Sequence, residues 1–585
     1  MKNLITKIML IAGIALSGLS CSGKQNTPDA PENPNGNNPQ MPPAEVVVDY
    51  ILQTPSAEKN VDAVDLTGNS PSDYLAVLSL QGLVNRDRAR IYTYCDRDRH
   101  ILEMYQQAGY INSVNTIASF EELLTKYKNV PQGAVVYDPD KNFTVNLATN
   151  IAGVENRLIL APDKIDMFKR ITGISDILDL RTLNFESRKE TFQWYKTNVF
   201  PRQSQKMVAL AKDLASMYDI FRDYLVEFKI PVFWLPGPRD RDFDSAYEQE
   251  VRSWLNQLPP NIPVLGFSIG VDDNGQSTGY EEMDGVTLTG LYGKFTLVNT
   301  WVGNYSFHSG IRPENNVYEQ DEPRKKTFRQ YDPQKKYVAL IMIESGDAPC
   351  YFLYQGFFPQ QWNQPERGEV AISYGLSPSL RMLIPGVLRH LYDTQTANDY
   401  FFCSISGVGY CYPFRGYADN TTSPAQSKSD YFEMTGKNMQ LLDMDMLGIY
   451  THPDSKWKAS DRDIADKYIF PIPGLKSIIS GMHRVGYTAA DGNEIKGSVT
   501  VHHTLTFWPT AANYTWNNPG QDAEAVRFME QEIKTYGTGG NFIQAMFYSW
   551  MYGPRRLKQL KEIMEPQGYE FVTLDEFDYL YRSVN

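Results

Sequence analysis

Residues 337–343 read Tyr-Val-Ala-Leu-Ile-Met-Ile, and the acidic turn Glu344-Ser345-Gly346-Asp347 follows them directly. A short apolar run that is bounded by a polar turn is typical of a buried β-strand. Six similar segments follow, at residues 399–404, 444–450, 475–480, 498–502, 542–548 and 569–572. Helix-like stretches separate most of them. Because seven strands alternate with helices over roughly 250 residues, this part is expected to form a TIM-like β/α barrel, with an open doubly wound sheet as the alternative.

The chain before this unit also alternates between strands and helices, which predicts small α/β modules. Ser70-Pro71-Ser72-Asp73 has a capping residue, a proline at the first helical position and an early acid, so a helix begins there. Residues 202–227 read as one long helix. The expected modules are 46–130, 131–228 and 229–312, followed by a polar linker at 313–334 and a C-terminal domain at 335–585. We expect this last unit to fold largely by itself.

The first residues resemble a secretion signal. Lys2 and Lys7 precede an apolar stretch at residues 8–19, which is too short for a membrane span, and Cys21 follows. Residues 22–45 are rich in Pro and Asn and predict an extended tether. Acylation of Cys21 would make the protein a lipoprotein that is anchored to a membrane of the cell envelope, facing the periplasm or the cell surface. Simple secretion is the alternative.

Composition limits the classes of partner. The net charge is −13 and no basic block is present, which argues against nucleic acid. No CxxC pair and no dinucleotide fingerprint occurs, so neither a metal nor a cofactor is expected. Cys403 and Cys411 are close enough in sequence to pair across a loop, although four buried free thiols are the favoured reading of the remaining cysteines. The sequence does not fix the oligomeric state.

Three segments resemble a known family. Gly407-Val408-Gly409-Tyr410-Cys411-Tyr412-Pro413 matches the signature of the GxGYxYP family of glycoside hydrolases letter for letter. Residues 372–378 (ISYGLSP) are similar to a segment upstream of that signature, and residues 80–86 (LQGLVNR) resemble the accompanying N-terminal module. The resemblance implies N-terminal α/β modules, a C-terminal main domain, a carbohydrate substrate and an origin in gut Bacteroidetes. It brings no established catalytic residue with it.

The candidate catalytic residues are Asp347 and Glu344, because carboxylates at a strand end are placed for acid, base or nucleophile work. A partner carboxylate on another strand is not identified. The signature turn offers two glycines for close backbone approach to a ligand and tyrosines that stack on a sugar, or it is a tight turn whose tyrosines pack locally. The candidate substrate-binding residues are Ser406, Gly407, Gly409, Tyr410, Tyr412, His452, Asp454, His502, Trp508 and Trp550. We expect the signature turn and the 344–347 turn to share one concave surface.

Two other functions stay open. The first is a metal-dependent polysaccharide deacetylase that uses Asp347 with His502 or His503. Adjacent residues on a strand point to opposite faces, so both histidines reach one metal only if the strand ends before them. The second is a non-catalytic cell-surface glycan-binding protein, in which the aromatic rings matter and the carboxylates do not.

Overall fold

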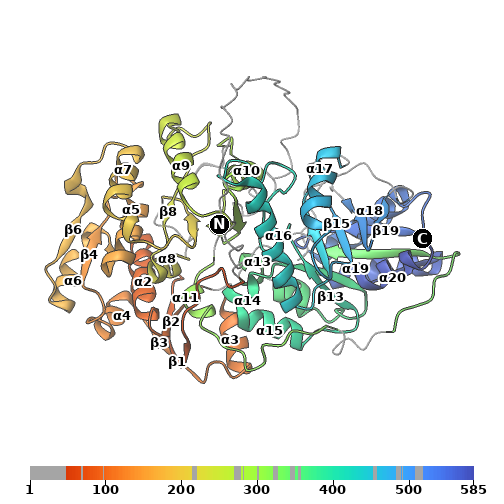
Figure 1. Cartoon of the computed structure of the whole chain (residues 1–585). Coiled ribbons are helices and arrows are strands. Elements are labelled where there is room, and N and C mark those ends of the chain that lie inside the picture. Colours follow the sequence, from red (N-terminus) through yellow and green to blue (C-terminus); the bar gives the residue numbers. More distant parts are fainter. Residues whose placement is uncertain are drawn as a thin grey trace, which may run out of the picture.

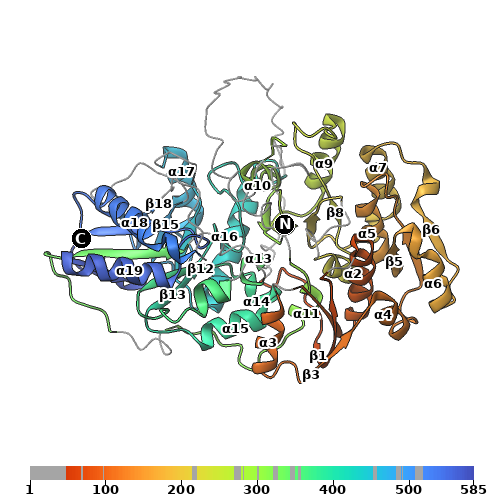
Figure 2. The same ribbon diagram turned by 180° about the vertical axis from the view of Figure 1, so that it is seen from behind.

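A computed structural model gives the fold of most of the chain (Figure 1). It describes residues 48–67, 70–95, 98–213, 221–268, 278–280, 282–299, 302–320, 327–342, 349–353, 357–451, 457–481, 489, 492–506 and 518–585. These residues form four β-sheets, in which all neighbouring strands are parallel except for one antiparallel pair in the largest sheet. In two opposite views the sheet formed between residues 133 and 179 lies at one end of the molecule. The largest sheet, formed between residues 336 and 572, lies at the other end, and the two remaining sheets lie between them (Figure 2).

The first two sheets have three strands each, with the earliest strand in the centre. The first has the order β2-β1-β3 and the second the order β5-β4-β6. Ser70 caps the first helix by accepting a hydrogen bond from the Asp73 amide, as predicted. The elements are β1 (Ala57–Asp65), α2 (Pro71–Asn85), β2 (Ala89–Tyr94), α3 (Arg99–Gln107), β3 (Ser113–Ile117), α4 (Phe120–Lys126), β4 (Gly133–Val136), α5 (Thr144–Glu155), β5 (Arg157–Leu160), α6 (Ile165–Thr172), β6 (Ile177–Asp179) and α7 (Arg188–Asn198).

The third sheet has the order β10-β9-β7-β8. The long helix predicted over residues 202–227 is wrong, because β7 (Val208–Leu210) lies inside that range and pairs with β8 and β9. Three consecutive buried residues there fit a short central strand. The third sheet therefore begins before residue 229. Its other elements are α8 (Arg222–Phe228), β8 (Val232–Phe233), α9 (Ser245–Gln257), β9 (Ile262–Gly266), α10 (Glu282–Leu291), β10 (Lys294–Leu297) and α11 (Tyr305–His308).

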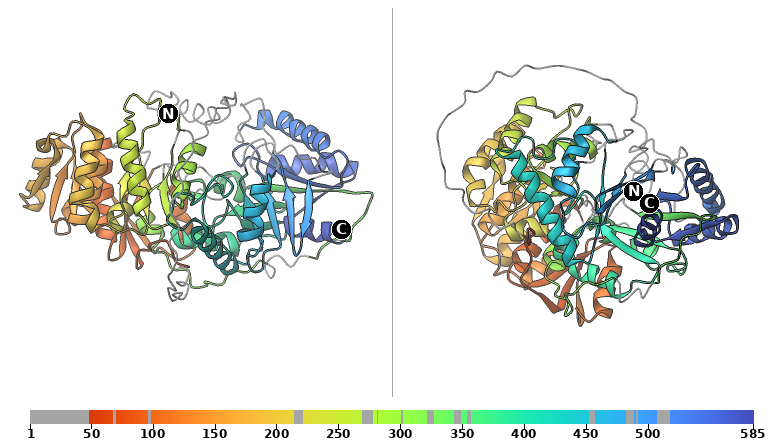
Figure 3. Two further views of the ribbon diagram at one scale, coloured as in Figure 1. Left: turned by 45° about the horizontal axis from the view of Figure 1, so that its top comes forward. Right: turned by 45° about the vertical axis from the view of Figure 1, so that its right-hand side comes forward.

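The fourth sheet has ten strands. Figure 3 shows in two orientations that this sheet is curled. Its order is β16-β17-β15-β14-β13-β12-β11-β19-β18, and β20 also pairs with β11. A closed TIM-like barrel of about seven strands is not confirmed, since this order has two ends. The strands are β11 (Lys336–Met342), β12 (Ile372–Leu376), β13 (Asp399–Cys403), β14 (Met446–Ile449), β15 (Ser477–Ser480), β16 (Asn493–Lys496), β17 (Val499–His503), β18 (Leu505–Thr506), β19 (Phe542–Met546) and β20 (Tyr569–Val572).

Helices cover the outer face of this sheet, where side chains such as Val338 and Leu340 join the main core. The opposite, inner face carries Ala339, Ile341 and Phe402. The helices of the domain are α13 (Pro349–Leu353), α14 (Leu380–Leu383), α15 (Pro385–Asp393), α16 (Pro424–Leu441), α17 (Ala459–Ile464), α18 (Asp522–Tyr536), α19 (Pro554–Met564) and α20 (Leu574–Arg582). Among the described residues, no helix is both long and apolar enough to cross a membrane.

The last helix packs on the inner face at the amino ends of the strands. Leu574, Phe577 and Leu580 of α20 belong to the same apolar cluster as Ala339 and Ile341 of β11. The Leu574 amide donates to Ser373 Oγ in β12. Because α20 fills this end, the carboxyl ends of the strands are the end where the inner face is free to form a site.

Candidate functional site

The signature turn, residues 407–413, follows β13 at the carboxyl edge of the sheet. Its backbone pairs with the third domain, because Tyr410 N donates to Thr296 O at 2.9 Å and Thr296 N donates to Tyr410 O at 2.8 Å. A Cβ on Gly409 would lie 2.5 Å from Phe295 Cδ2. Gly407 has a φ of +126°, and a Cβ there would lie 2.5 Å from Thr435 Oγ1. Both glycines therefore allow the signature turn to pack closely against neighbouring segments of the protein, Gly409 against Phe295 and Gly407 against Thr435.

The two signature tyrosines are buried. Tyr410 is 1% exposed and Tyr412 is 2% exposed, and their hydroxyl oxygens lie 2.5 Å apart. The ring of Tyr450, which follows β14, packs edge-on against Tyr410 with centroids 5.2 Å apart. The Arg415 guanidinium lies 5.3 Å from the centroid of the Tyr412 ring. The two tyrosine rings thus pack locally within the protein, and their hydroxyls bond to each other.

A carboxylate from the third domain joins this cluster. Glu282, the first residue of α10, lies near the Tyr410 hydroxyl. Burial raises the pKa of the Glu282 carboxyl, and its interaction with Tyr410 opposes that shift. Sequence reasoning missed Glu282, because an acid in the first turn of a helix is ordinarily explained by the helix dipole. Figures 1 and 2 place α10 beside α16 of the C-terminal domain.

Other residues predicted for the site lie on the same edge. Ser406 is fully buried, and its Oγ accepts from the Tyr450 amide at 3.2 Å. Trp550, which follows β19, is half-buried, and its ring centroid lies 5.0 Å from that of Tyr548. The structure thus brings Ser406, the signature turn and Trp550 to one edge of the sheet.

Five predicted residues, Glu344, Asp347, His452, Asp454 and Trp508, lie outside the described residues. The strands that precede them are informative. β11 ends at Met342 and β13 ends at Cys403. β12 lies between these two strands in the sheet and is parallel to both. Carboxyl ends of parallel strands gather on one edge, so β11 ends at Met342 on the same edge of the sheet as β13.

The two histidines point to opposite faces of the sheet. β17 continues through His503, so the condition for a shared metal is not met. His502 is fully buried, and its ring nitrogens lie 2.8 Å from Asn493 Oδ1 and 2.9 Å from Asp578 Oδ1. His503 instead faces Glu494 and the Trp457 ring. In the described part of the chain, no cluster of three metal-ligating side chains occurs.

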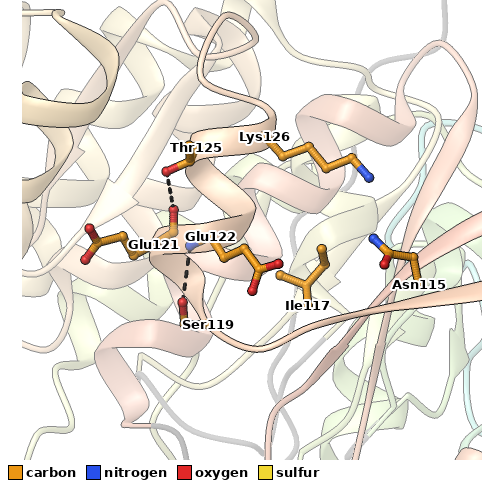
Figure 4. A pocket seen from close by; sticks show the side chains of 7 residues that line it. All are labelled: Asn115, Ile117, Ser119, Glu121, Glu122, Thr125 and Lys126. Carbon is orange, nitrogen blue, oxygen red and sulfur yellow. Dashed lines mark hydrogen bonds between the residues drawn. The ribbon is translucent and has the colours of Figure 1, made fainter.

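A separate pocket of about 550 Å³ lies on the first domain (Figure 4). Its two carboxylate residues already have structural roles at the start of α4. Glu121 pairs with Arg170 at 2.9 Å, and the Glu122 carboxylate accepts from the Ala118 amide. No aromatic ring lines this pocket, so a sugar finds no stacking face there. Its lining residues are Asn115, Ile117, Ser119, Glu121, Glu122, Thr125 and Lys126.

The fold and this edge define the class of the protein. It is a multidomain α/β protein with parallel sheets, and the candidate site lies at the carboxyl ends of the strands of its largest sheet. The chain belongs to the GxGYxYP family. The family's first domain matches residues 60–129, its second 131–203 and its third 206–310, and the "GxGYxYP putative glycoside hydrolase C-terminal domain" matches 334–582.

Among solved structures, a putative hydrolase from Bacteroides thetaiotaomicron is similar with a TM-score of 0.71 and 18% identity, over 93% of this chain and 98% of that one. This similarity establishes a shared fold. The peptidoglycan deacetylase PdaC from Bacillus subtilis aligns with a TM-score of 0.24 and 7% identity, over 43% of this chain and 95% of that one, and it supports no argument. No curated protein matches the sequence.

Proposed function

We propose that the protein is a glycoside hydrolase that acts on glycans outside the cytoplasm with paired carboxylates. One observation carries the proposal: the family's signature turn, residues 407–413, follows β13 at the carboxyl edge of the sheet, where β11 also ends. In the sequence, Glu344 and Asp347 come directly after β11, whose carboxyl end lies on that edge. Glycosidic cleavage needs two carboxyl groups, about 5–5.5 Å apart for retention and about 6.5–9.5 Å apart for inversion.

The shape of the sheet supports this proposal. β17 and β18 are separated by Thr504 alone, yet β17 pairs with β15 and β18 pairs with β19. We infer that this continuous segment draws the two sides of the curled sheet together into a nearly closed barrel of about seven strands. Such a barrel gathers its catalytic loops at one mouth.

The test is hydrolysis of a panel of polysaccharides and aryl glycosides by residues 45–585. Asp347→Asn is expected to lower kcat/KM by about 10²–10⁴-fold, because a carboxylate that transfers a proton contributes that much. Asp463→Asn, which changes an exposed acid on α17, is the control and is expected to retain activity. Full activity of Asp347→Asn would remove that residue from the mechanism, and an inactive parent protein would refute the hydrolase.

A second candidate is a non-catalytic glycan-binding protein. The half-buried Trp550 ring at the same edge, which packs on the buried Tyr548, favours it, since a partly exposed aromatic ring is suited to stacking on a sugar. Affinity electrophoresis in polysaccharide gels distinguishes the two functions. Retardation without release of reducing sugar, abolished by Trp550→Ala, would favour binding alone.

A further inference from the structure

A turn at residues 548–552 follows β19 at the carboxyl edge of the largest sheet. Its own backbone closes it, because Met551 N and Tyr552 N both donate to Tyr548 O, at 2.9 Å and 3.0 Å. Trp550 lies in the middle of this turn. Its half-buried ring packs on the Tyr548 ring, which is 5% exposed, with centroids 5.0 Å apart and ring planes 36° apart. Trp550 is therefore the ring of this pair that is partly open to solvent.

The Trp550 side chain belongs to the inner face of the sheet. It packs against the apolar cluster of that face, which includes Ile405, Tyr410 and Tyr412. The two signature tyrosines are almost fully buried, so they offer no free ring face to a ligand. Trp550 thus adds a partly exposed ring at the carboxyl ends of the strands, where ligands of parallel α/β sheets bind.

A buried amide holds the turn on both sides of Trp550. Gln361 lies in the short π-helix Phe358–Trp362 and is fully buried. Its Nε2 donates to Ser549 O at 2.7 Å and to Tyr552 O at 2.6 Å. A primary amide nitrogen has two protons, and both are used here on main-chain carbonyls that flank Trp550.

Two further side chains fix the same turn. The Tyr351 hydroxyl donates to Ser549 O at 3.2 Å, and Arg556 Nη1 donates to Met551 O. The backbone around Trp550 is therefore held before any ligand arrives. A ring that is already in place loses little conformational freedom on binding, which favours affinity.

We propose that Trp550 is the platform on which a neutral pyranose unit of the glycan stacks, and that Gln361 is its positioning residue. This inference rests on the proposed glycoside hydrolase for the reaction, although its binding step is measured without cleavage. One face of a pyranose carries mainly C–H bonds and suits an aromatic ring. The ring face has negative partial charge and the protein has a net charge of −13, so a carboxylate or sulfate on the sugar is disfavoured.

The alternative is that Gln361 stabilises the fold and has no specific effect on sugar binding. A double-mutant cycle separates the two roles. A positioning residue acts through Trp550, so its removal has no further effect on binding once the Trp550 ring is gone. A residue that affects binding by another route lowers it equally with and without that ring.

The first measurement is affinity electrophoresis in gels that contain galactomannan or xyloglucan, which are neutral, or polygalacturonate or alginate, which are acidic. We expect a neutral polysaccharide to retard the parent protein. Trp550→Ala is expected to weaken this association by about 10–100-fold, as loss of an aromatic anchor does, and Trp550→Phe to weaken it less. Retardation by the acidic polysaccharides only, no retardation at all, or an unchanged Trp550→Ala would overturn the platform.

The second measurement adds Gln361→Met, which keeps the length of the side chain and removes both donors. It is expected to weaken association by about 3–10-fold, and by nothing more in the Trp550→Ala background. Equal weakening in both backgrounds, or none in either, would overturn the positioning role. If Gln361→Met does not fold, Tyr351→Phe removes one hydrogen bond to the same turn and is tested in the same cycle.

Gln320→Met is the matched control. Gln320 is also buried, and its Nε2 donates to two main-chain carbonyls, Phe401 O at 3.0 Å and Asp443 O at 2.7 Å. Asp443 comes before β14, at the opposite end of the strands from Trp550. This variant is expected to lose stability as Gln361→Met does and to bind the polysaccharide like the parent.

Release of reducing sugar from the retarding polysaccharide tests the reaction separately. In an active parent, Trp550→Ala is expected to raise KM with kcat little changed, because stacking holds substrate and transition state alike. A loss confined to kcat would overturn the platform and leave the hydrolase standing. A parent that binds a neutral polysaccharide through Trp550 and releases no sugar would refute the hydrolase and support the platform.

Discussion

Gly409 shows at the residue scale why the signature requires glycine. Its missing side chain leaves room for Phe295, and the flanking backbone pairs with Thr296. Gly409→Ala is expected to destabilise the protein by about 1–3 kcal/mol, because overpacking forces neighbours to shift. Gly290→Ala is the control, since its Cβ would meet only a ring atom of Tyr417 at 3.8 Å. Chemical denaturation measures both, and equal stability of the two variants would contradict the packing argument.

Two buried carboxyls on α8 make stability depend on pH. Asp223 Oδ2 accepts from the Ser306 hydroxyl at 2.6 Å, and Glu227 Oε1 accepts from the Thr54 hydroxyl at 2.7 Å. Burial raises the pKa of Asp223 from 3.8 to about 6 and raises that of Glu227 as well. A raised carboxyl pKa gives stability that is fully present below the unfolded pKa, near 4, and that is lost as pH rises through about 6.

Asp223→Asn is therefore expected to reduce this pH dependence, because its amide keeps an acceptor for Ser306 and cannot ionise. Between about pH 4 and pH 7, the variant should gain about 2–3 kcal/mol relative to the parent, at about 1.4 kcal/mol per pKa unit. Denaturation at a series of pH values measures the difference. Asp87→Asn, whose side chain is 91% exposed, should follow the parent. A difference between Asp223→Asn and parent that is constant across pH would refute the prediction.

At the scale of elements, α20 depends on one buried ion pair. Asp578 accepts from His502 at 2.9 Å, from Ser477 at 2.7 Å and from Arg582 at 2.7 Å. Asp578→Ala is expected to cost about 3–5 kcal/mol, since it leaves buried partners uncompensated. Asp578→Asn, which keeps the shape and one acceptor, should cost less. Thermal unfolding monitored by circular dichroism ranks the variants, and a neutral Asp578→Ala would show that α20 is held by apolar packing alone.

The ion pair between Asp578 and His502 also makes the stability of the protein depend on pH in acid. Hydrogen bonds and the charge of His502 lower the pKa of Asp578 to about 2 against the effect of burial. A lowered carboxyl pKa gives stability that is present above the unfolded pKa and lost as pH falls through about 2. This part of the inner face thus serves the fold, and His502 contributes to it through its contact with Asp578.

The hydrophobic pattern of the sequence predicts a strand correctly where the strand is a continuous apolar run, as in β11, β13 and β19. It missed β12, where Ser373 and Gly375 interrupt the run, and β7, whose three residues stand close to helix-like sequence. It identified the edge that carries the signature but not Glu282. The start of α10 approaches the signature turn, which comes more than one hundred residues later in the chain. Such a tertiary contact cannot be predicted from the hydrophobic periodicity of either segment.

At the scale of the whole molecule, attachment to a membrane is a separate prediction. The basic and apolar start of the chain and the Pro-rich residues 22–45 favour a lipid anchor on Cys21. Cys21→Ala is expected to move the protein from the membrane to the soluble fraction and to abolish palmitate labelling. Cys95→Ala, which leaves the expected anchor intact, is the control. Unchanged fractionation of Cys21→Ala would refute the lipoprotein.

The core is continuous across domains, and this changes the expectation for the C-terminal unit. One apolar cluster contains Tyr105 of the first domain, Phe295 of the third and Phe401 of the fourth. In addition, the Tyr50 hydroxyl lies 2.8 Å from Ser379 Oγ. Residues 334–585 alone would expose the surfaces that these side chains cover, although the sequence pattern suggested independent folding.

We therefore expect residues 334–585, produced alone, to bind a hydrophobic dye and to lack a cooperative thermal transition. The apolar surface that the other domains cover would then be exposed to water, and its burial would no longer stabilise the fold. Cleavage of the intact protein at a protease site introduced beside Val317, which is 60% exposed, provides the matched control. The cut chain has the same C-terminal residues but keeps its neighbours, so its two parts should co-elute and melt together. A monomeric 334–585 fragment with a cooperative transition like that of the cut protein would show that the shared core is dispensable.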